Sequence, residues 1–200
     1  MTAEPLGARP DPPRMSRTGD RVRLREAMST DAALLDRWDA DRGHWRGQFN
    51  DFGPDRPTPA PAELLRAGER LVGADHGRVL VERMDDGEVI GSVGWHAVRY
   101  GPNAASTAWN IGISLVPDAR GHGFGAEAQR LAARMLLEAT GVGRVEASTD
   151  VANVAEQRAL HKAGFVREGV LRRAQHRGGA WHDLVLFSVV RADLDDAGPG

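Results

Sequence analysis

The sequence predicts an α/β domain with a mixed, mostly antiparallel central sheet of six or seven strands and helices on both faces. Three observations lead to this fold class. Four extended segments, three of them consecutive, occupy the chain as far as residue 116. Beyond that point a helix, a strand, a second helix and two further strands follow. With 200 residues, of which 41% are hydrophobic, the chain can also bury one full core.

The individual elements follow from residue periodicity. Alternating apolar and polar residues predict strands, and apolar residues three and four apart predict helices. The turn DDGE at 85–88 joins two strands into a hairpin, and Pro61 is typical of a helix start. The predicted strands cover 20–27, 77–84, 89–100, 106–116, 143–150, 165–174 and 181–194, and the predicted helices cover 29–38, 61–72, 126–138 and 153–164.

Three regions are expected along the chain. Residues 1–18 are rich in proline and polar residues, which predicts a disordered arm. Residues 19–192 form a single domain, and residues 193–200 form a flexible tail. Within the domain, residues 39–60 make a long loop rich in aromatic residues, glycine and proline.

Composition excludes several classes of protein. The net charge of −2 gives no electrostatic footprint for nucleic acid. No apolar run approaches the length of a membrane-spanning helix, and no signal peptide is evident, so we expect a cytoplasmic protein. Cysteine is absent, which removes thiol nucleophiles and Cys-based metal sites, and we expect no metal. Only Lys162 among the 26 basic residues is lysine, which indicates a GC-rich bacterial source.

Three alternating glycines stand where a helix must begin. The segment 119–136, ARGHGFGAEAQRLAARML, places Gly121, Gly123 and Gly125 directly before an amphipathic helix. Each glycine costs a helix about 1 kcal/mol relative to alanine. The cost is understandable if the backbone must approach a ligand and point free N–H groups at it. A helix N-terminus has such donors and a partial positive charge, which suit a phosphate.

Two other interpretations of this loop are open. The segment 121–126 also matches the dinucleotide fingerprint G-x-G-x-x-A, with Asp150 at the end of the next strand. In a dinucleotide fold, however, the first glycine follows the strand directly. Here four residues intervene after Val116, and only 75 residues follow Gly125. The loop could also be a plain connector, but this leaves the proline and arginine beside it unexplained.

The wider pattern resembles the GNAT superfamily of acyl-CoA-dependent N-acetyltransferases. The family hallmark is a strand, a proline and then Arg/Gln-x-x-Gly-x-Gly/Ala opening a helix. This chain has SLVPDARGHGFGA, with Arg120, Gly123 and Gly125 at the hallmark positions. The end of the chain is similar to the branch that includes bacterial ribosomal-protein N-terminal acetyltransferases. The resemblance covers residues 20–192. A second family segment comprises Asn153, Lys162, Gly164 and Phe165.

The resemblance implies acetyl-CoA as co-substrate. The loop N–H groups would hold its pyrophosphate, and a side chain at Gly123 would fill the space where pyrophosphate meets backbone. The splayed strand at 113–116 would bind the pantetheine arm and offer one N–H as an oxyanion donor. Asn153 would bind a pantetheine amide, although a helix N-cap role is equally natural. The implied cofactor-binding residues are Ile113, Ser114, Leu115, Val116, Arg120, Gly121, His122, Gly123, Phe124, Gly125, Ala126 and Asn153.

The sequence departs from the family at the catalytic positions. Many members carry an acidic tyrosine where this chain has Leu160, and a strand glutamate where it has Asn110. The ribosomal branch tends to have serine at the position of Glu156. We therefore predict Glu156 and His96 as the groups that move protons. The alternatives are a solvated helix carboxylate and an uninvolved strand residue.

The acceptor amine is expected to bind between the loop 39–60 and the sheet. Trp45 and Asp51 would attract and hold a cation. The opposite wall would be formed by the strand residues Trp95, His96 and Asn110. The predicted function is acetyl transfer from acetyl-CoA to a small-molecule amine. Acetylation of a protein N-terminus and a non-catalytic acyl-CoA-binding module are the alternatives. No nucleic acid or membrane partner is expected, and the protein could be a monomer or a homodimer.

Overall fold

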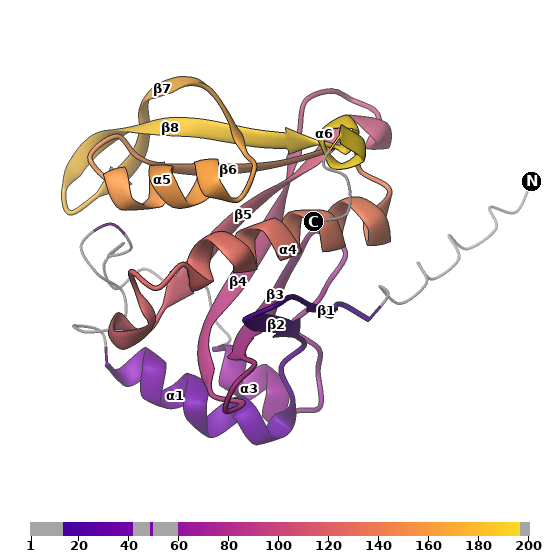
Figure 1. Cartoon of the computed structure of the whole chain (residues 1–200), viewed down its shortest axis with the longest axis vertical. Helices are drawn as coiled ribbons and strands as arrows, with labels where there is room; N and C mark the ends of the chain where they lie inside the picture. The colour runs from indigo at the N-terminus through magenta and orange to yellow at the C-terminus, as the bar shows by residue number, and fades with distance from the viewer. Residues whose placement is uncertain (1–13, 42–48, 50–59, 197–200) are drawn as a thin grey trace, which may run out of the picture.

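One continuous eight-stranded sheet organises the part of the chain that the structure, a computed structural model, describes: residues 14–41, 49 and 60–196 (Figure 1). The strand order is β1-β2-β3-β4-β5-β6-β8-β7; β5 and β6 are parallel and the other pairs are antiparallel. This confirms the predicted fold class. The elements are β1 (Arg17–Thr18), β2 (Val22–Arg25), η1 (Ser29–Asp31), α1 (Ala32–Ala40), α3 (Pro61–Arg66), β3 (His76–Arg83), β4 (Val89–Arg99), η2 (Ala104–Ser106), β5 (Thr107–Leu115), η3 (Pro117–Ala119), α4 (Phe124–Thr140), β6 (Arg144–Asp150), α5 (Val154–Lys162), β7 (Val166–Arg177), β8 (Ala180–Val190) and α6 (Arg191–Asp196).

The eighth strand is a short one that the sequence did not predict. β1 has two residues, which pair with Arg23 and Leu24 of β2. It lies inside the stretch 1–18 that we expected to be an arm, and Met15, just before it, is buried in the core. A strand of two residues has no alternation for a sequence pattern to detect.

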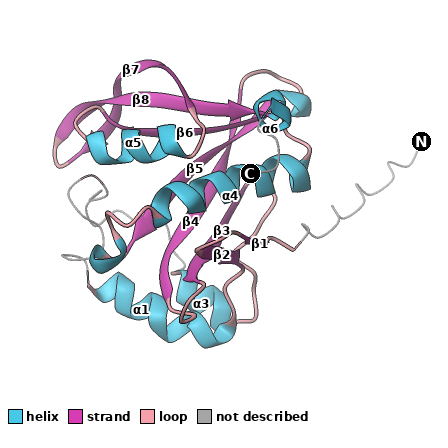
Figure 2. Ribbon diagram, in the orientation of Figure 1, coloured by secondary structure: helices cyan, strands magenta, loops and turns pink. Residues whose placement is uncertain are grey.

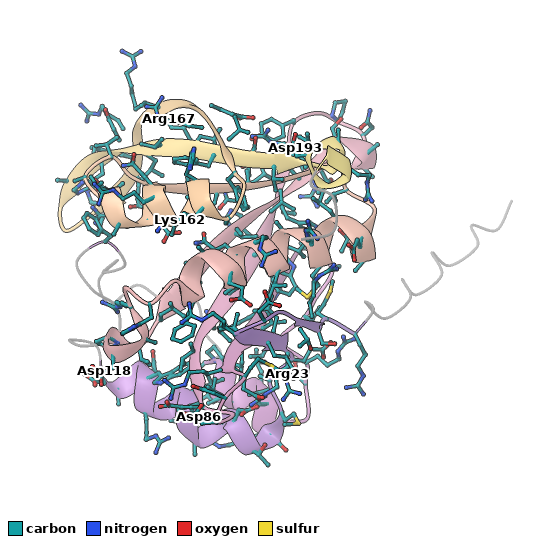
Figure 3. The ribbon with its side chains drawn as sticks, viewed as in Figure 1. Arg23, Asp86, Asp118, Lys162, Arg167 and Asp193 are labelled. Atoms are coloured by element: carbon teal, nitrogen blue, oxygen red, sulfur yellow. The ribbon has the colours of Figure 1, made fainter. Side chains whose placement is uncertain are left out.

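Two element ends differ most from the prediction. α3 ends at Arg66 rather than continuing to residue 72, and Gly68 beyond it has φ +80°, which a helix cannot accommodate. The last strand, predicted to reach residue 194, ends at Val190, and α6 begins at Arg191. The carboxylate of Asp193, labelled in Figure 3, accepts the Val190 N–H at 2.8 Å. This local hydrogen bond favours a helical turn at a place where the apolar pattern alone predicts more strand.

Helices cover both faces of the sheet, as Figure 2 shows. We call one of them the α4 face, because Leu131 of α4 and Leu160 of α5 share a core there with the strand side chains. We call the other the opposite face. There α1 and α3 pack over β3, whose Leu80 belongs to a second core together with Leu35 of α1 and Leu65 of α3.

Alternation along β4 and β5 sends neighbouring residues to different faces. Trp95 and Trp109 are buried in the core of the α4 face, where the Trp109 indole N–H donates to the Thr140 hydroxyl at 2.8 Å. His96 and Asn110, which pair across the same two strands, lie on the opposite face. Residues adjacent in these strands therefore cannot line one wall.

β5 and β6 separate after three paired positions. The last pair is Ile111 with Ala147, yet β5 continues to Leu115 and β6 to Asp150. Over these ends β5 stays bonded to β4, and β6 to β8. Figure 1 shows β6, β7 and β8 running away from β3, β4 and β5, with α4 across the front. Among the described residues, the facing edges of β5 and β6 thus have no strand partner beyond the last pair.

We expect Gly91→Ala to destabilise the protein where Gly94→Ala does not. A Cβ at Gly91 would overlap the backbone oxygen of Ser114 in β5, and a strand backbone cannot give way as a side-chain end can. A Cβ at Gly94 would meet the Gly77 oxygen at an ordinary 3.6 Å. In urea unfolding, the free energy of unfolding should fall by about 1–3 kcal/mol for Gly91→Ala. For Gly94→Ala it should stay within about 0.5 kcal/mol of wild type. Equal stability of the two variants would contradict a rigid β4–β5 contact.

Candidate functional site

The loop before α4 collects backbone N–H groups that have no internal acceptor. Gly121 and Gly123 take positive φ angles of +80° and +86°, and Gly123 is the N-cap of α4. Within the described residues, none of the N–H groups from Gly121 to Ala126 donates to an acceptor. They gather at the positive end of a 17-residue helix, where the donors and the helix dipole favour an anion.

Two arginines hold this loop in place. The Arg120 Nε donates to the Leu115 carbonyl at 2.9 Å, so the loop stays attached to the end of β5. The Arg21 Nη1 donates to the His122 carbonyl at 2.7 Å, and its guanidinium lies 4.5 Å from the centre of the Phe124 ring. Arg21 lies 101 residues from His122 in the chain, and no sequence signal pointed to it.

The three glycines have three different surroundings. A Cβ at Gly123 would meet the Arg21 Nη1 at 3.3 Å, so this glycine supplies the positive φ and room for an arginine. Our expectation that a side chain here would also fill the space of a ligand stays a prediction. A Cβ at Gly121 would meet no atom within 4 Å. A Cβ at Gly125 would lie 3.5 Å from Leu115, which makes it a helix–strand packing position.

The diverged end of β5 lies directly beside the start of α4. Ile113 and Leu115 turn their side chains toward Gly125, and both pack in the core of the α4 face. The Val116 N–H donates to the Ile90 carbonyl of β4 at 2.9 Å, which keeps the strand end in place. The donor-rich loop and the end of β5 that has left β6 therefore lie side by side.

Asn153 begins α5 at the end of β6. Its Oδ1 accepts the Glu156 N–H at 3.3 Å, and its Nδ2 donates to the Thr149 hydroxyl at 3.0 Å. The side chain therefore acts as the helix N-cap and is held on both sides. Lys162, at the other end of α5, is exposed on the surface (Figure 3).

Glu156 lies against α4 on the α4 face. Its half-buried carboxyl neighbours Gln129, whose side chain is 1% exposed. Burial raises the pKa of Glu156 to about 7, and a hydrogen bond from Gln129 acts in the opposite direction. The Gln129 Nε2 donates to the Gly125 carbonyl at 3.2 Å, while its Oε1 has no partner among the described residues.

The predicted acceptor residues do not come together as one wall. His96 is exposed, and Asn110 is half-buried beside it, both on the opposite face. Trp95 is 4% exposed and lies in the core of the α4 face, so the predicted wall of Trp95 and Asn110 does not form. Trp45 and Asp51 lie outside the described residues.

A buried ion pair lies at the end of β6. Asp150 and Arg177 are 5% and 7% exposed, and the Arg177 Nη2 donates to the Asp150 Oδ2 at 2.5 Å. Although burial raises the pKa of Asp150, hydrogen bonds from the Ala152 N–H and from Arg177 outweigh it and hold that pKa below its usual value. Arg177 also donates to the Phe49 carbonyl at 3.0 Å, and its guanidinium lies 5.5 Å from the Phe49 ring centre. Sequence patterns gave no indication of this link between β7 and the loop 39–60.

Two kinds of feature are not found within the described ranges 14–41, 49 and 60–196. No group of three or more His, Cys, Asp or Glu side chains there could hold a metal ion. None of the helices in those ranges is long and apolar enough to cross a membrane.

The fold and the site define an α/β protein whose divided sheet meets a donor-rich helix N-terminus. A family model described as an acetyltransferase (GNAT) domain matches residues 21–166, which is more than half of the chain. The protein belongs to the GNAT acetyltransferase family.

Curated relatives match over part of their length. The chain is similar to the uncharacterized N-acetyltransferase YoaA and the probable N-acetyltransferase YjcK, both from Bacillus subtilis, with 32% identity over 111 and 108 residues. The matches cover 56% and 54% of this chain, and 60% and 58% of the relatives. The chain thus spans less than two thirds of the length of these relatives.

Solved structures match over most of the chain. A probable GNAT acetyltransferase from Chromobacterium violaceum has a TM-score of 0.69 and 24% identity, covering 98% of this chain and 96% of that one. A ribosomal-protein-S5-alanine acetyltransferase from Vibrio fischeri has a TM-score of 0.66 and 22% identity, and the match covers 92% of this chain and 99% of that one. A chimera of the spermidine N-acetyltransferase SpeG from Vibrio cholerae has a TM-score of 0.67 and 18% identity, and the match covers 88% of this chain and 99% of that one. At these identities the likeness establishes the fold.

We expect Glu156 to make stability fall as the pH rises from about 4.5 to about 7. The folded pKa of about 7 exceeds the ordinary 4.5, so its contribution is full below pH 4.5 and is lost as the pH passes 7. Glu156→Gln cannot ionise, so its melting temperature should rise relative to wild type between pH 5 and pH 8. The difference should correspond to about 1 kcal/mol or more. Glu69→Gln, at an exposed site, is the control; an equal, pH-independent difference for both variants would contradict the burial of Glu156.

Proposed function

We propose that this protein transfers an acetyl group from acetyl-CoA to the primary amine of a small molecule, such as an antibiotic, a polyamine or an amino-acid derivative. One observation carries the acetyl-CoA part of this proposal, and the amine panel described below tests the acceptor. The unsatisfied N–H groups at the start of α4 adjoin the strand edge that β5 exposes when it leaves β6. An elongated ligand with an anionic end and amide groups would satisfy both.

Acetyl-CoA has these features, and when bound it supplies an acetyl thioester. The N–H groups from Gly121 to Ala126 would hold its pyrophosphate, and Arg120 would assist them. The backbone edge at 113–116 and the amide of Asn153 would bind the pantetheine arm. An N–H on the same edge would stabilise negative charge on the thioester oxygen.

Proton transfer would involve different groups on the two faces. A lysine-like amine with a pKa near 10.4 must lose a proton before it attacks, whereas an α-amine near 7.7–8.0 is partly neutral. A ring nitrogen of His96, exposed on the opposite face, would accept that proton. Glu156, with a pKa of about 7, would hold a proton at its carboxyl for the departing thiolate.

Two alternatives each have an observation in their favour. The ribosomal-protein alanine acetyltransferase is as similar in fold as the spermidine enzyme, which keeps a protein N-terminus as a possible acceptor. The position of the family's acidic tyrosine is Leu160, which is fully buried and has no proton to give. This is compatible with an acyl-CoA-binding module that does not catalyse transfer.

A thiol-release assay with acetyl-CoA and a panel of amines tests the proposal. The panel should contain polyamines, aminoglycosides, amino-acid amides and peptides with free N-termini. Release that depends on a small amine supports the proposal, and release with peptides alone supports the protein acceptor. Binding of acetyl-CoA in calorimetry without release for any amine would favour the non-catalytic module.

We expect Gly121→Val to weaken acetyl-CoA binding by about tenfold or more, on the order of 1.4 kcal/mol. The valine would force the backbone from its positive φ and redirect the N–H groups meant for pyrophosphate. Gly87→Val is a matched control, because Gly87 has φ +75° and equally open surroundings in the β3–β4 turn. Calorimetry should show near wild-type affinity for Gly87→Val. Equal losses for both would mean that strain, not the loop, weakens binding.

A further inference from the structure

A polar network crosses the opposite face of the sheet where β5 and β6 begin to part. Its centre is Glu146 of β6, which is 3% exposed and pairs with Asn110 of β5. The Glu146 Oε2 accepts the Tyr100 hydroxyl at 2.5 Å and the Arg144 Nε at 3.1 Å. The Glu146 Oε1 accepts the Nδ2 of Asn110 at 3.3 Å.

The direction of these hydrogen bonds is fixed by charge. Burial and the hydrogen bond to Glu146 raise the pKa of Tyr100, so its phenol remains a donor. Arg144 is a donor at every pH of interest and also binds Glu168 through two contacts of 2.6 and 2.7 Å. An ionised Glu146 accepts only, which suits three donors around two oxygens.

This direction determines how the Asn110 amide is turned. Its NH₂ group must face Glu146, so its Oδ1 must face away from it. Within the described residues Oδ1 accepts no hydrogen bond, and it is not among the buried atoms left without a partner. Gly112, the next residue on the same face, has no side chain, and its surroundings are open, since a Cβ there would meet no atom within 4 Å. An open acceptor oxygen therefore stands beside the gap between β5 and β6.

We propose that Glu146 is a positioning residue that holds the Asn110 amide so that Oδ1 accepts a hydrogen bond from the N–H of the acceptor amine. The identity of the ligand rests on the proposed function, whereas the orientation of the amide does not. The role requires no bond to form or break at Glu146. In this role, the Asn110 side chain, which lies where β5 and β6 separate, recognises the N–H of the amine.

Glu146→Gln should reverse the network. The carbonyl oxygen of the new amide would face the Tyr100 and Arg144 donors, which leaves its NH₂ toward Asn110. The Asn110 amide would then turn, and its own NH₂ group would face the gap. The amine would meet donors where it needs an acceptor, and unpaired donors are costly to bury together.

Steady-state kinetics with the best amine of the panel measure this effect. We expect Glu146→Gln to raise KM for the amine by about tenfold while KM for acetyl-CoA changes less than about threefold. Adding Asn110→Asp should restore the amine KM to within about threefold of wild type, because a carboxylate can accept from both sides. A purely structural role for Glu146 predicts no such rescue. An unchanged amine KM in Glu146→Gln, or no rescue in the double variant, would overturn the proposal.

Glu168→Gln is the matched control. It removes a carboxylate from the same network, since Glu168 binds Arg144 and Ser188, but it does not contact Asn110. The amide proton signals of Asn110 in NMR, assigned with Asn110→Asp, should shift in Glu146→Gln and stay in place in Glu168→Gln. Identical signals in wild type and Glu146→Gln would overturn the positioning role even in an active acetyltransferase. If wild type acetylates no amine, the proposed function fails, and the NMR comparison still decides how Asn110 is held.

Discussion

The rest of the structure depends on one interruption in backbone hydrogen bonding. β5 and β6 part after Ile111 and Ala147, and each keeps its other neighbour, so the sheet stays intact on both sides. Backbone N–H and C=O groups without partners are costly when they are buried. The interruption is therefore stable only where solvent or a ligand reaches the two edges. It turns an ordinary sheet into a binding surface made of backbone.

The start of α4 is held against this interruption by contacts from distant parts of the chain. Arg120 joins the loop to the last carbonyl of β5, and Arg21 joins it to the N-terminal strands. Glu127, in the first turn of the helix, accepts the Arg21 N–H at 2.9 Å. These contacts leave the donors of the loop unsatisfied while restricting their positions. Restriction before binding reduces the entropy that a ligand would otherwise lose in ordering the loop.

Local periodicity predicted the fold class and most elements, because alternation and helical spacing are properties of neighbouring residues. Contacts between strands carry no such signal. Neither Arg21, 101 residues from His122, nor Glu146, 36 residues from Asn110, could be recognised as a partner. The wall of Trp95 and Asn110 failed because residues of opposite parity were assigned to one face. Strand register has to be known before parity across two strands can be used.

The groups of the candidate site are divided between the two faces of the sheet. Glu156 and the donors of the loop lie on the α4 face, whereas His96 and Asn110 lie on the opposite face. An intact sheet would separate these groups completely, since paired backbone leaves no route between the faces. Beyond Ile111 and Ala147, however, β5 and β6 share no paired positions within the described residues. In the function proposed above, a ligand bound along α4 and a second ligand beside Asn110 would therefore meet at that edge.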